Sequence, residues 1–314
     1  FTGNYDFWYQ MSQILQKQAK DQQKKREDKM ADLKQFIQRF ASNVSKSGQA
    51  SSRKKMLEKM ELEDIPVTSR KFPYVGFQPE REIGNFVLTA EKLNSKDDDG
   101  NVLLNDFSIT IHPGEKVAFV GMEHNSITSF FDIVSETKKP ESGTYSWGQT
   151  TSHSYMGRDN SAYFNNELTI TDWLKQYSPD QDDAYVRGFL GRMLFSGDDG
   201  LKKVKVLSGG EKVRCMLSKM MLSGANVLIL DDPTNHLDLE SIESLNEGLV
   251  KFPGVVMFSS HDHEFISTIA NRIIEITPKG IIDRMMNFDD YLKDDQVKQL
   301  RKEYYAGLNK KIRI

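Results

Sequence analysis

The chain has 314 residues, of which 38% are hydrophobic and 28% charged, and its formal net charge is −3. This composition excludes collagen-like, mucin-like and wholly disordered proteins. Apolar runs such as residues 227–230 are the length of a strand, well below the ~18 residues that a spanning helix needs, so we expect no membrane span. The single cysteine, Cys215, excludes an internal disulfide and suggests a reducing, cytoplasmic location.

Charge is divided unevenly along the chain. Residues 1–62 carry 13 Lys and Arg against 7 Asp and Glu, a net charge of +6, and the remaining residues carry 29 against 38, a net charge of −9. This division predicts a basic arm attached to an acidic globular body. The chain also begins at Phe1 and not at a methionine, which suggests a segment of a longer protein.

The first 85 residues read as a helical hairpin followed by a connector. Residues 8–41 lack proline and glycine, and their apolar side chains at 33, 36, 37 and 40 recur at helical spacing. Turn-forming residues at 42–48 separate them from a second helix expected near 50–61. Two helices with a short loop fold back on one another, so we assign 8–65 to a hairpin linker. Prolines at 66, 73 and 79 predict an extended connector over 66–85.

From about residue 86 the pattern becomes that of an α/β domain. Strands are predicted near 86–88 and 103–111, with a turn at 97–100 between them. Residues 116–121 are expected to form a buried strand that ends in Gly121. Residues 168–224 are expected to be largely helical, and the apolar runs 227–230 and 255–258 to be further strands. Strands that alternate with helices indicate a largely parallel sheet.

Three motifs suggest a phosphate-binding site: LSGGE at 207–211, LILDDPTNHLD at 228–238 and SSHD at 259–262. Ser208, Gly209 and Gly210 at a helix start would offer backbone N–H groups to phosphate oxygens. The carboxylate of Asp231, at the exposed end of an apolar strand, could hold Mg²⁺. The neighbouring Asp232 could orient an attacking water, and His261 could reach a γ-phosphate.

Each of these motifs alone has an ordinary structural explanation. A Gly-Gly pair is usually a turn, and a lone histidine is usually a core or surface residue. The combination of all three motifs in this order and spacing is what favours the functional interpretation.

Taken together, the three motifs resemble those of the ATP-binding cassette (ABC) ATPases. The sequence PTNHLD, the absence of a membrane span and the charged hairpin resemble those of the ABC-F family. Members of that family fuse two cassettes through a helical linker and act on ribosomes. The hairpin segments 36–40 and 51–61 also look like that family's linker.

The resemblance implies a P-loop NTPase domain with a parallel-sheet core, an antiparallel β subdomain and a helical subdomain, preceded by the hairpin. Residues 1–7 would be the tail of a preceding ABC domain, 86–292 the second ABC domain and 293–314 a charged C-terminal extension. A short echo of residues 4–8 in residues 287–291 favours this division. ATP and Mg²⁺ are the implied cofactors, with Glu211 completing the signature and Thr128 joining Asp231 at the metal. The implied partners are the first ABC domain of the full-length chain and the ribosome, through ribosomal and transfer RNA.

The phosphate loop departs from the family pattern. The expected G-x-x-x-x-G-K-[ST] reads GMEHNSIT at 121–128, so Gly121 and Thr128 match, but Ser126 replaces glycine and Ile127 replaces lysine. An ammonium ~4 Å from phosphate contributes ~4 kcal/mol of attraction at an effective dielectric constant near 20, before desolvation, and isoleucine contributes none. Arg158 stands at the expected glutamine, and Asp232 at the expected glutamate. We therefore expect this half's own site to be degenerate.

The basic residues Lys46, Arg53, Lys54 and Lys55 cluster around the hairpin turn. They could neutralise RNA phosphates, or they could form a solvated helix face, which is the usual meaning of a charge run. The family resemblance favours RNA.

Three functions remain open at this point: an ATP-driven translation or ribosome-protection factor, a largely non-hydrolytic scaffold, and the ATPase subunit of a transporter. The transporter hypothesis predicts no basic hairpin. This chain alone is expected to be inactive, because its loop and its signature would serve different composite sites.

Overall fold

The computed structural model describes residues 24, 28, 30, 34 and 72–306. The chain divides into two compact units, with the boundary after Arg70. In the first unit, Lys24, Asp28, Met30 and Lys34 are helical, as expected for residues 8–41. The rest of the predicted hairpin, including its turn, lies outside the described residues. Among the residues described, no helix is long and apolar enough to cross a membrane.

A six-stranded sheet forms the centre of the second unit, in the order β5-β6-β7-β3-β8-β9. Its strands are β3 (Lys116–Gly121), β5 (His153–Met156), β6 (Val227–Asp231), β7 (Val255–Ser259), β8 (Arg272–Thr277) and β9 (Gly280–Arg284). The first five are parallel, and β9 pairs antiparallel with β8 at the edge. Every residue of β6, β7 and β8 is buried. The apolar runs of β6 and β7 predict this for a sheet covered on both faces, whereas β8 also buries Arg272 and Glu275.

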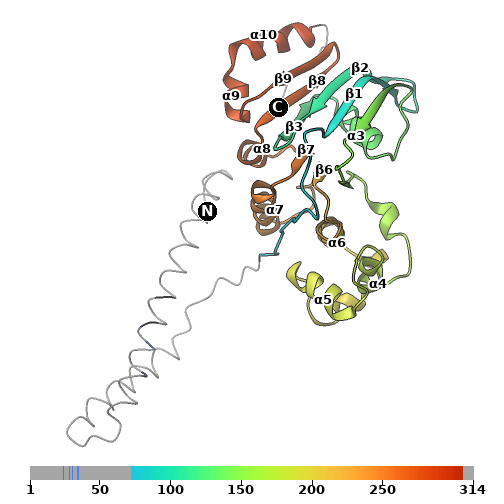
Figure 1. The fold of residues 1–314 in the computed structure, drawn as a ribbon, viewed down its shortest axis with the longest axis vertical. Coiled ribbons are helices and arrows are strands. Elements are labelled where there is room, and N and C mark those ends of the chain that lie inside the picture. Colours follow the sequence, from blue (N-terminus) through green and yellow to red (C-terminus); the bar gives the residue numbers. More distant parts are fainter. Residues whose placement is uncertain (1–23, 25–27, 29, 31–33, 35–71, 307–314) are drawn as a thin grey trace, which may run out of the picture. The chain divides into compact units, whose positions relative to one another are not determined.

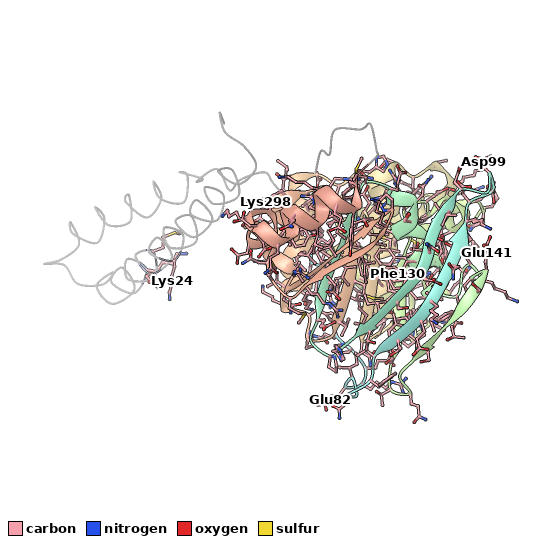
Figure 2. The ribbon with its side chains drawn as sticks, turned by 90° about the horizontal axis from the view of Figure 1, so that it is seen from above. Lys24, Glu82, Asp99, Phe130, Glu141 and Lys298 are labelled. Carbon is pink, nitrogen blue, oxygen red and sulfur yellow. The ribbon has the colours of Figure 1, made fainter. Side chains whose placement is uncertain are left out.

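A smaller antiparallel sheet, in the order β2-β1-β4, packs on helix α3 (His124–Val134), on the side of the helix opposite to the large sheet. It consists of β1 (Leu88–Lys96), β2 (Val102–Ile111) and β4 (Ser142–Trp147), and the expected turn at 97–100 joins β1 to β2. The core is formed between this sheet, α3 and the large sheet. Phe130 of α3 is fully buried there, whereas Asp99 and Glu141 lie at the rim (Figure 2).

The segment 168–224 contains several short helices, and the expectation of a largely helical region is met only in part. It comprises α4 (Ile170–Lys175), α5 (Asp183–Arg192), the 3₁₀ turns Gly197–Leu201 and Val204–Val206, and α6 (Gly209–Leu222). A further 3₁₀ turn, Ser161–Phe164, precedes them. In Figure 1, α4 and α5 lie beyond α6, away from the two sheets. The glycines at 197 and 200 and the left-handed Leu194 (φ 62°) interrupt the helical run.

Four helices complete the unit: α7 (Leu239–Lys251), α8 (His263–Ile269), α9 (Phe288–Lys293) and α10 (Asp295–Tyr304). Helices α9 and α10 lie beside β8 and β9 (Figure 1). Strands β8 and β9 are elements that the sequence analysis did not single out. The described part of the segment 293–314, assigned to a charged C-terminal extension, includes helix α10, and Tyr305 directly after that helix is buried.

Candidate nucleotide site

The carboxyl ends of three neighbouring strands meet at one edge of the large sheet. Strand β3 ends at Gly121, β6 at Asp231 and β7 at Ser259, and Asp231 is directly paired with Ser259. This edge is where ligands bind in open α/β sheets. The structure therefore brings together the phosphate loop and the motif residues Asp231 and Asp232, as the sequence predicts.

Asp231 is a buried carboxylate whose two oxygens both accept hydrogen bonds. Its Oδ2 accepts from Thr128 Oγ1 at 2.6 Å, and its Oδ1 accepts from Ser259 Oγ at 2.7 Å and from His124 Nε2 at 2.8 Å. The Asp231 side chain is fully buried, and that of His124 is 13% exposed. Burial raises the pKa of Asp231, but the three donors outweigh burial and hold that pKa below its ordinary value. The carboxylate therefore stays ionised at neutral pH.

His124 is a site residue that the sequence analysis missed. It is the first residue of α3, inside the phosphate loop, and its ring lies 5.4 Å from the ring of His261, centroid to centroid. His261 itself is exposed, just beyond β7. The loop sequence did contain a signal, because a histidine in the loop after β3 lies at the edge of the sheet where the carboxyl ends of the parallel strands meet. Only the fold brings it to Asp231.

The hydrogen bonds of Asp231 restrict where Mg²⁺ could bind. Thr128 and Asp231 are adjacent, as a metal site formed by them requires. Of the about four acceptor positions of the carboxylate, three are taken, including both on Oδ1. A cation bound directly to Oδ1 would need His124 or Ser259 to move away, because a hydrogen-bond donor and a metal ion compete for the same lone pairs.

The altered loop positions have structural roles of their own. Ile127 is 1% exposed and belongs to the apolar core, and Ser126 is also buried. Gly121 fits closely against β8, since a Cβ there would lie 2.6 Å from the carbonyl oxygen of Ile276. The position that would carry a lysine thus carries an apolar side chain packed into the core.

Asp232 follows β6 in a left-handed conformation, with φ 53°. Its backbone N–H donates to Ser259 Oγ at 2.9 Å, and its carboxylate accepts from Asn235 Nδ2. The side chain is 5% exposed. Asp232 is therefore held by the loop that follows it, with Asn235 occupying one of its oxygens.

The signature segment starts helix α6. Ser208 caps this helix in a capping box: Glu211 N–H donates to Ser208 Oγ at 3.4 Å, and Ser208 N–H donates to Glu211 Oε2 at 2.9 Å. Lys202 Nζ also lies 3.6 Å from the Glu211 carboxylate. Ser208 and Gly209 are exposed, so the helix N-terminus faces away from the core.

The two signature glycines pack against the loop after β6. A Cβ on Gly209 would lie 3.0 Å from the ring of His236, and a Cβ on Gly210 would lie 2.8 Å from the carbonyl oxygen of His236. His236 has a φ of 66°, so its backbone has little freedom to retreat. The glycines are thus needed for contact within this domain, which the sequence analysis did not foresee.

Gly210→Ala is expected to lower the free energy of unfolding by about 1–3 kcal/mol, because the added methyl group meets a fixed backbone carbonyl. Gly188→Ala, in the middle of α5 with open space around its Cβ, is the control, and it should stabilise by about 0.5–1 kcal/mol. Urea unfolding measures both. A Gly210→Ala variant as stable as the parent chain would contradict the close contact with His236.

Other residues proposed from the sequence lie elsewhere or outside the described part. Arg158 is exposed after β5, while Tyr155 of that strand donates from its hydroxyl to Asp132 Oδ1 at 2.9 Å. The hairpin residues Lys46, Arg53, Lys54 and Lys55 lie outside the described residues. Within residues 72–306 and the four described positions of the first unit, no group of three or more His, Cys, Asp or Glu is arranged to hold a metal ion.

Comparison with known proteins agrees with this geometry. Family models described as "ABC transporter" match residues 1–77 and 104–235. The chain is 54% identical to an uncharacterized ABC transporter ATP-binding protein, YkpA of Bacillus subtilis, across 98% of this chain and 57% of that protein. It is 30% identical to ABC transporter F family member 2 of Arabidopsis thaliana, across 93% of this chain and 43% of that protein. The chain thus spans about half the length of these curated relatives.

Among solved structures, the dimeric structure of a bacterial ABC transporter cassette superimposes with a TM-score of 0.54 at 15% identity, covering 64% of this chain and 99% of that one. This likeness concerns the fold, and the α/β P-loop ABC ATPase fold that the sequence predicts is confirmed. Cassettes of this fold bind ATP, generally with Mg²⁺.

Proposed function

Because this chain contains an ABC ATP-binding domain, we propose that it is the helical linker and second cassette of an ABC-F protein that acts on the ribosome in the cytoplasm. Residues 1–7 would be the end of the first cassette, and residues 8–65 would form the ribosome-facing hairpin. Residues 66–85 would connect this hairpin to the second cassette, which residues 86–292 would form. The motif wording and the basic hairpin support this proposal. So does the relation to an F family member of about twice this length.

The observation that carries the proposal is the contrast between two parts of the cassette. The signature at 207–211 keeps its full sequence and starts α6 at the exposed residues Ser208 and Gly209. The domain's own site instead combines Ile127 in the core, His124 on Asp231 and the short carboxylate of Asp232. In ABC dimers each nucleotide lies between one cassette's phosphate loop and the other's signature. We infer that this half completes the site of the first cassette, while its own site contributes little turnover.

The purified 314-residue chain should hydrolyse ATP negligibly, because its loop and its signature belong to different composite sites. Phosphate release by the monomeric chain measures this, and the full-length protein is the positive control. Robust turnover by the monomer that His261→Ala abolishes would contradict the proposal.

The hairpin tip should bind ribosomal or transfer RNA. Replacing Lys46, Arg53, Lys54 and Lys55 with alanine in the full-length protein should weaken ribosome binding and reduce its salt dependence. For four lost phosphate contacts, the slope of the logarithm of the binding constant against the logarithm of the salt concentration should become less steep by up to about 3. The control variant replaces Lys24, Lys25 and Arg26 with alanine. The positive charge of these three residues is partly offset by the acidic residues Glu27 and Asp28. Pelleting with ribosomes across a salt series measures both. An unchanged slope in the first variant would indicate a solvated face.

A non-hydrolytic scaffold is the second candidate function, and the His124–Asp231 contact favours it. If the first cassette is also degenerate, the full-length protein would bind the ribosome without turnover. ATP hydrolysis by the full-length protein, measured with and without ribosomes, separates the two functions: stimulation by ribosomes supports the translation factor, and its absence supports the scaffold.

A further inference from the structure

The connector that precedes β1 is bound along the helices of this domain. It is described from residue 72, forms neither helix nor strand, and runs beside α7 and α6 in Figure 1. Tyr74 N–H donates to the carbonyl oxygen of Arg192, the last residue of α5, at 2.8 Å. Glu80 N–H donates to the carbonyl oxygen of Gly224, just beyond α6, at 2.9 Å. Residues 74–80, which we call the strap, therefore join the C-terminal ends of α5 and α6.

The middle of the strap packs on α7 and the residues after it. Val75 and Phe77 are buried, and the ring of Phe77 lies edge-on to that of Phe252, with 6.1 Å between the centroids. Gly248 of α7 faces the strap backbone, because a Cβ at this position would lie 2.8 Å from the carbonyl oxygen of Val75. The strap thus contacts three helices that are far apart in the sequence.

The outer end of the strap, at Tyr74, is the less firmly held one. Tyr74 is 54% exposed and Arg192 is also exposed. The Arg192 guanidinium lies over the ring of Tyr74 at 5.8 Å and over that of Phe189 at 5.0 Å, and a cation–π contact at an exposed site is weak. A cavity of about 420 Å³ also remains between the strap and α7. When the strap separates from the domain, this end therefore separates first.

The end of α5 leads to the signature through a series of ion pairs. After Arg192 the chain continues through the two 3₁₀ turns to Ser208. Asp199 of the first turn lies 2.8 Å from Lys202 Nζ, and Lys202 Nζ lies 3.6 Å from the Glu211 carboxylate. Glu211 is the residue that closes the capping box with Ser208. A displacement of the end of α5 would therefore disturb the residues that hold the start of α6.

We propose that the strap positions the signature: bound on α5, α6 and α7, it holds the segment that leads to Ser208, and separation of Tyr74 from Arg192 loosens that segment. The hairpin precedes the strap in the chain, so a partner that pulls on the hairpin acts first on this outer end. The hold of the strap on α5 goes beyond the proposed function and stands without it. Its consequence for ATP turnover by the first cassette rests on the proposed function.

Two variants of the 314-residue chain loosen the strap from opposite ends. Arg192→Ala removes the guanidinium that stacks on Tyr74, and Gly248→Ala places a methyl group against the carbonyl oxygen of Val75. Amide exchange in the strap should become about threefold faster in the first variant and about tenfold faster in the second. In both variants, exchange at residues 208–212 should become faster as well, and more so in Gly248→Ala.

Matched controls change α5 without touching the strap. Arg187→Ala removes an exposed arginine from the same helix, and Gly188→Ala adds a methyl group where there is open space. Neither should speed exchange in the strap or at residues 208–212. Exchange in β3 reports on the stability of the whole domain and should stay unchanged in all four variants.

Three results would overturn the proposal. The first is faster exchange in the strap with unchanged exchange at residues 208–212, because the signature would then not depend on the strap. The second is unchanged exchange in the strap in both Arg192→Ala and Gly248→Ala. The third is an equal acceleration in the strap, the signature and β3, because that would reflect loosening of the whole domain.

ATP turnover by the full-length protein tests the consequence for catalysis. Gly248→Ala should lower kcat severalfold and change KM little, because the first cassette's phosphate loop still binds the nucleotide while the signature is less well placed. An unchanged kcat would contradict a role of the strap in turnover. If the unaltered full-length protein hydrolyses no ATP, the proposed hydrolytic function fails, and the exchange measurements still decide whether the strap positions the signature.

Discussion

Arginine in place of Ser208 is expected to abolish most ATP turnover by the full-length protein, whereas Asp232→Asn should change turnover little. Ser208 begins α6 at the exposed signature, where we place the first cassette's nucleotide. A guanidinium there fills that space, and losing the cap costs only about 1 kcal/mol of stability. Asp232 instead belongs to the site whose Asp231 is covered by His124.

The controls separate blocked binding from damage to the fold. Ser223→Arg places the same side chain at the exposed opposite end of α6 and should retain turnover. Steady-state phosphate release with thermal unfolding measures all three variants. If Asp232→Asn lowers turnover more than Ser208→Arg does, the proposed asymmetry between the two nucleotide sites is wrong, and the carboxylate of Asp232 takes part in catalysis.

Restoring the phosphate loop should require more than restoring its lysine. Ile127→Lys alone is expected to gain little affinity for N-methylanthraniloyl-ATP with Mg²⁺, because His124 still covers Asp231 and the new stem replaces a core side chain. The triple variant His124→Ala, Ser126→Gly, Ile127→Lys should bind about 100-fold more tightly. That corresponds to ~2.7 kcal/mol remaining of the ~4 kcal/mol Coulomb attraction after desolvation.

Ile127→Met in the same His124→Ala, Ser126→Gly background is the matched control, since methionine has a long side chain without charge. It should bind no more than a few fold tighter than the parent chain. Fluorescence titration measures the affinities. A large gain from Ile127→Lys alone would show that His124 does not restrict the site.

The main elements of the cassette could be predicted from local sequence. The buried strands β6 and β7 carry continuous apolar runs whose composition by itself specifies burial, and β3 ends at the glycine that the loop requires. The long segment 168–224 was predicted less well, since its breaks at Leu194 and Gly197 depend on single residues in left-handed conformations. Strands β8 and β9 carry similar apolar residues but were not recognised, because no motif follows them.

Sequence alone determined the motif order, the lost lysine at Ile127 and the intact signature, since these are statements about residue types at fixed spacing. Only the tertiary structure determined that His124 bonds to Asp231, that Gly210 packs on His236 and that Tyr305 donates to Glu275. These pairs are separated by 107, 26 and 30 positions along the chain. No local pattern encodes such contacts, because they arise only when the sheet and the helices packed on it bring distant segments side by side.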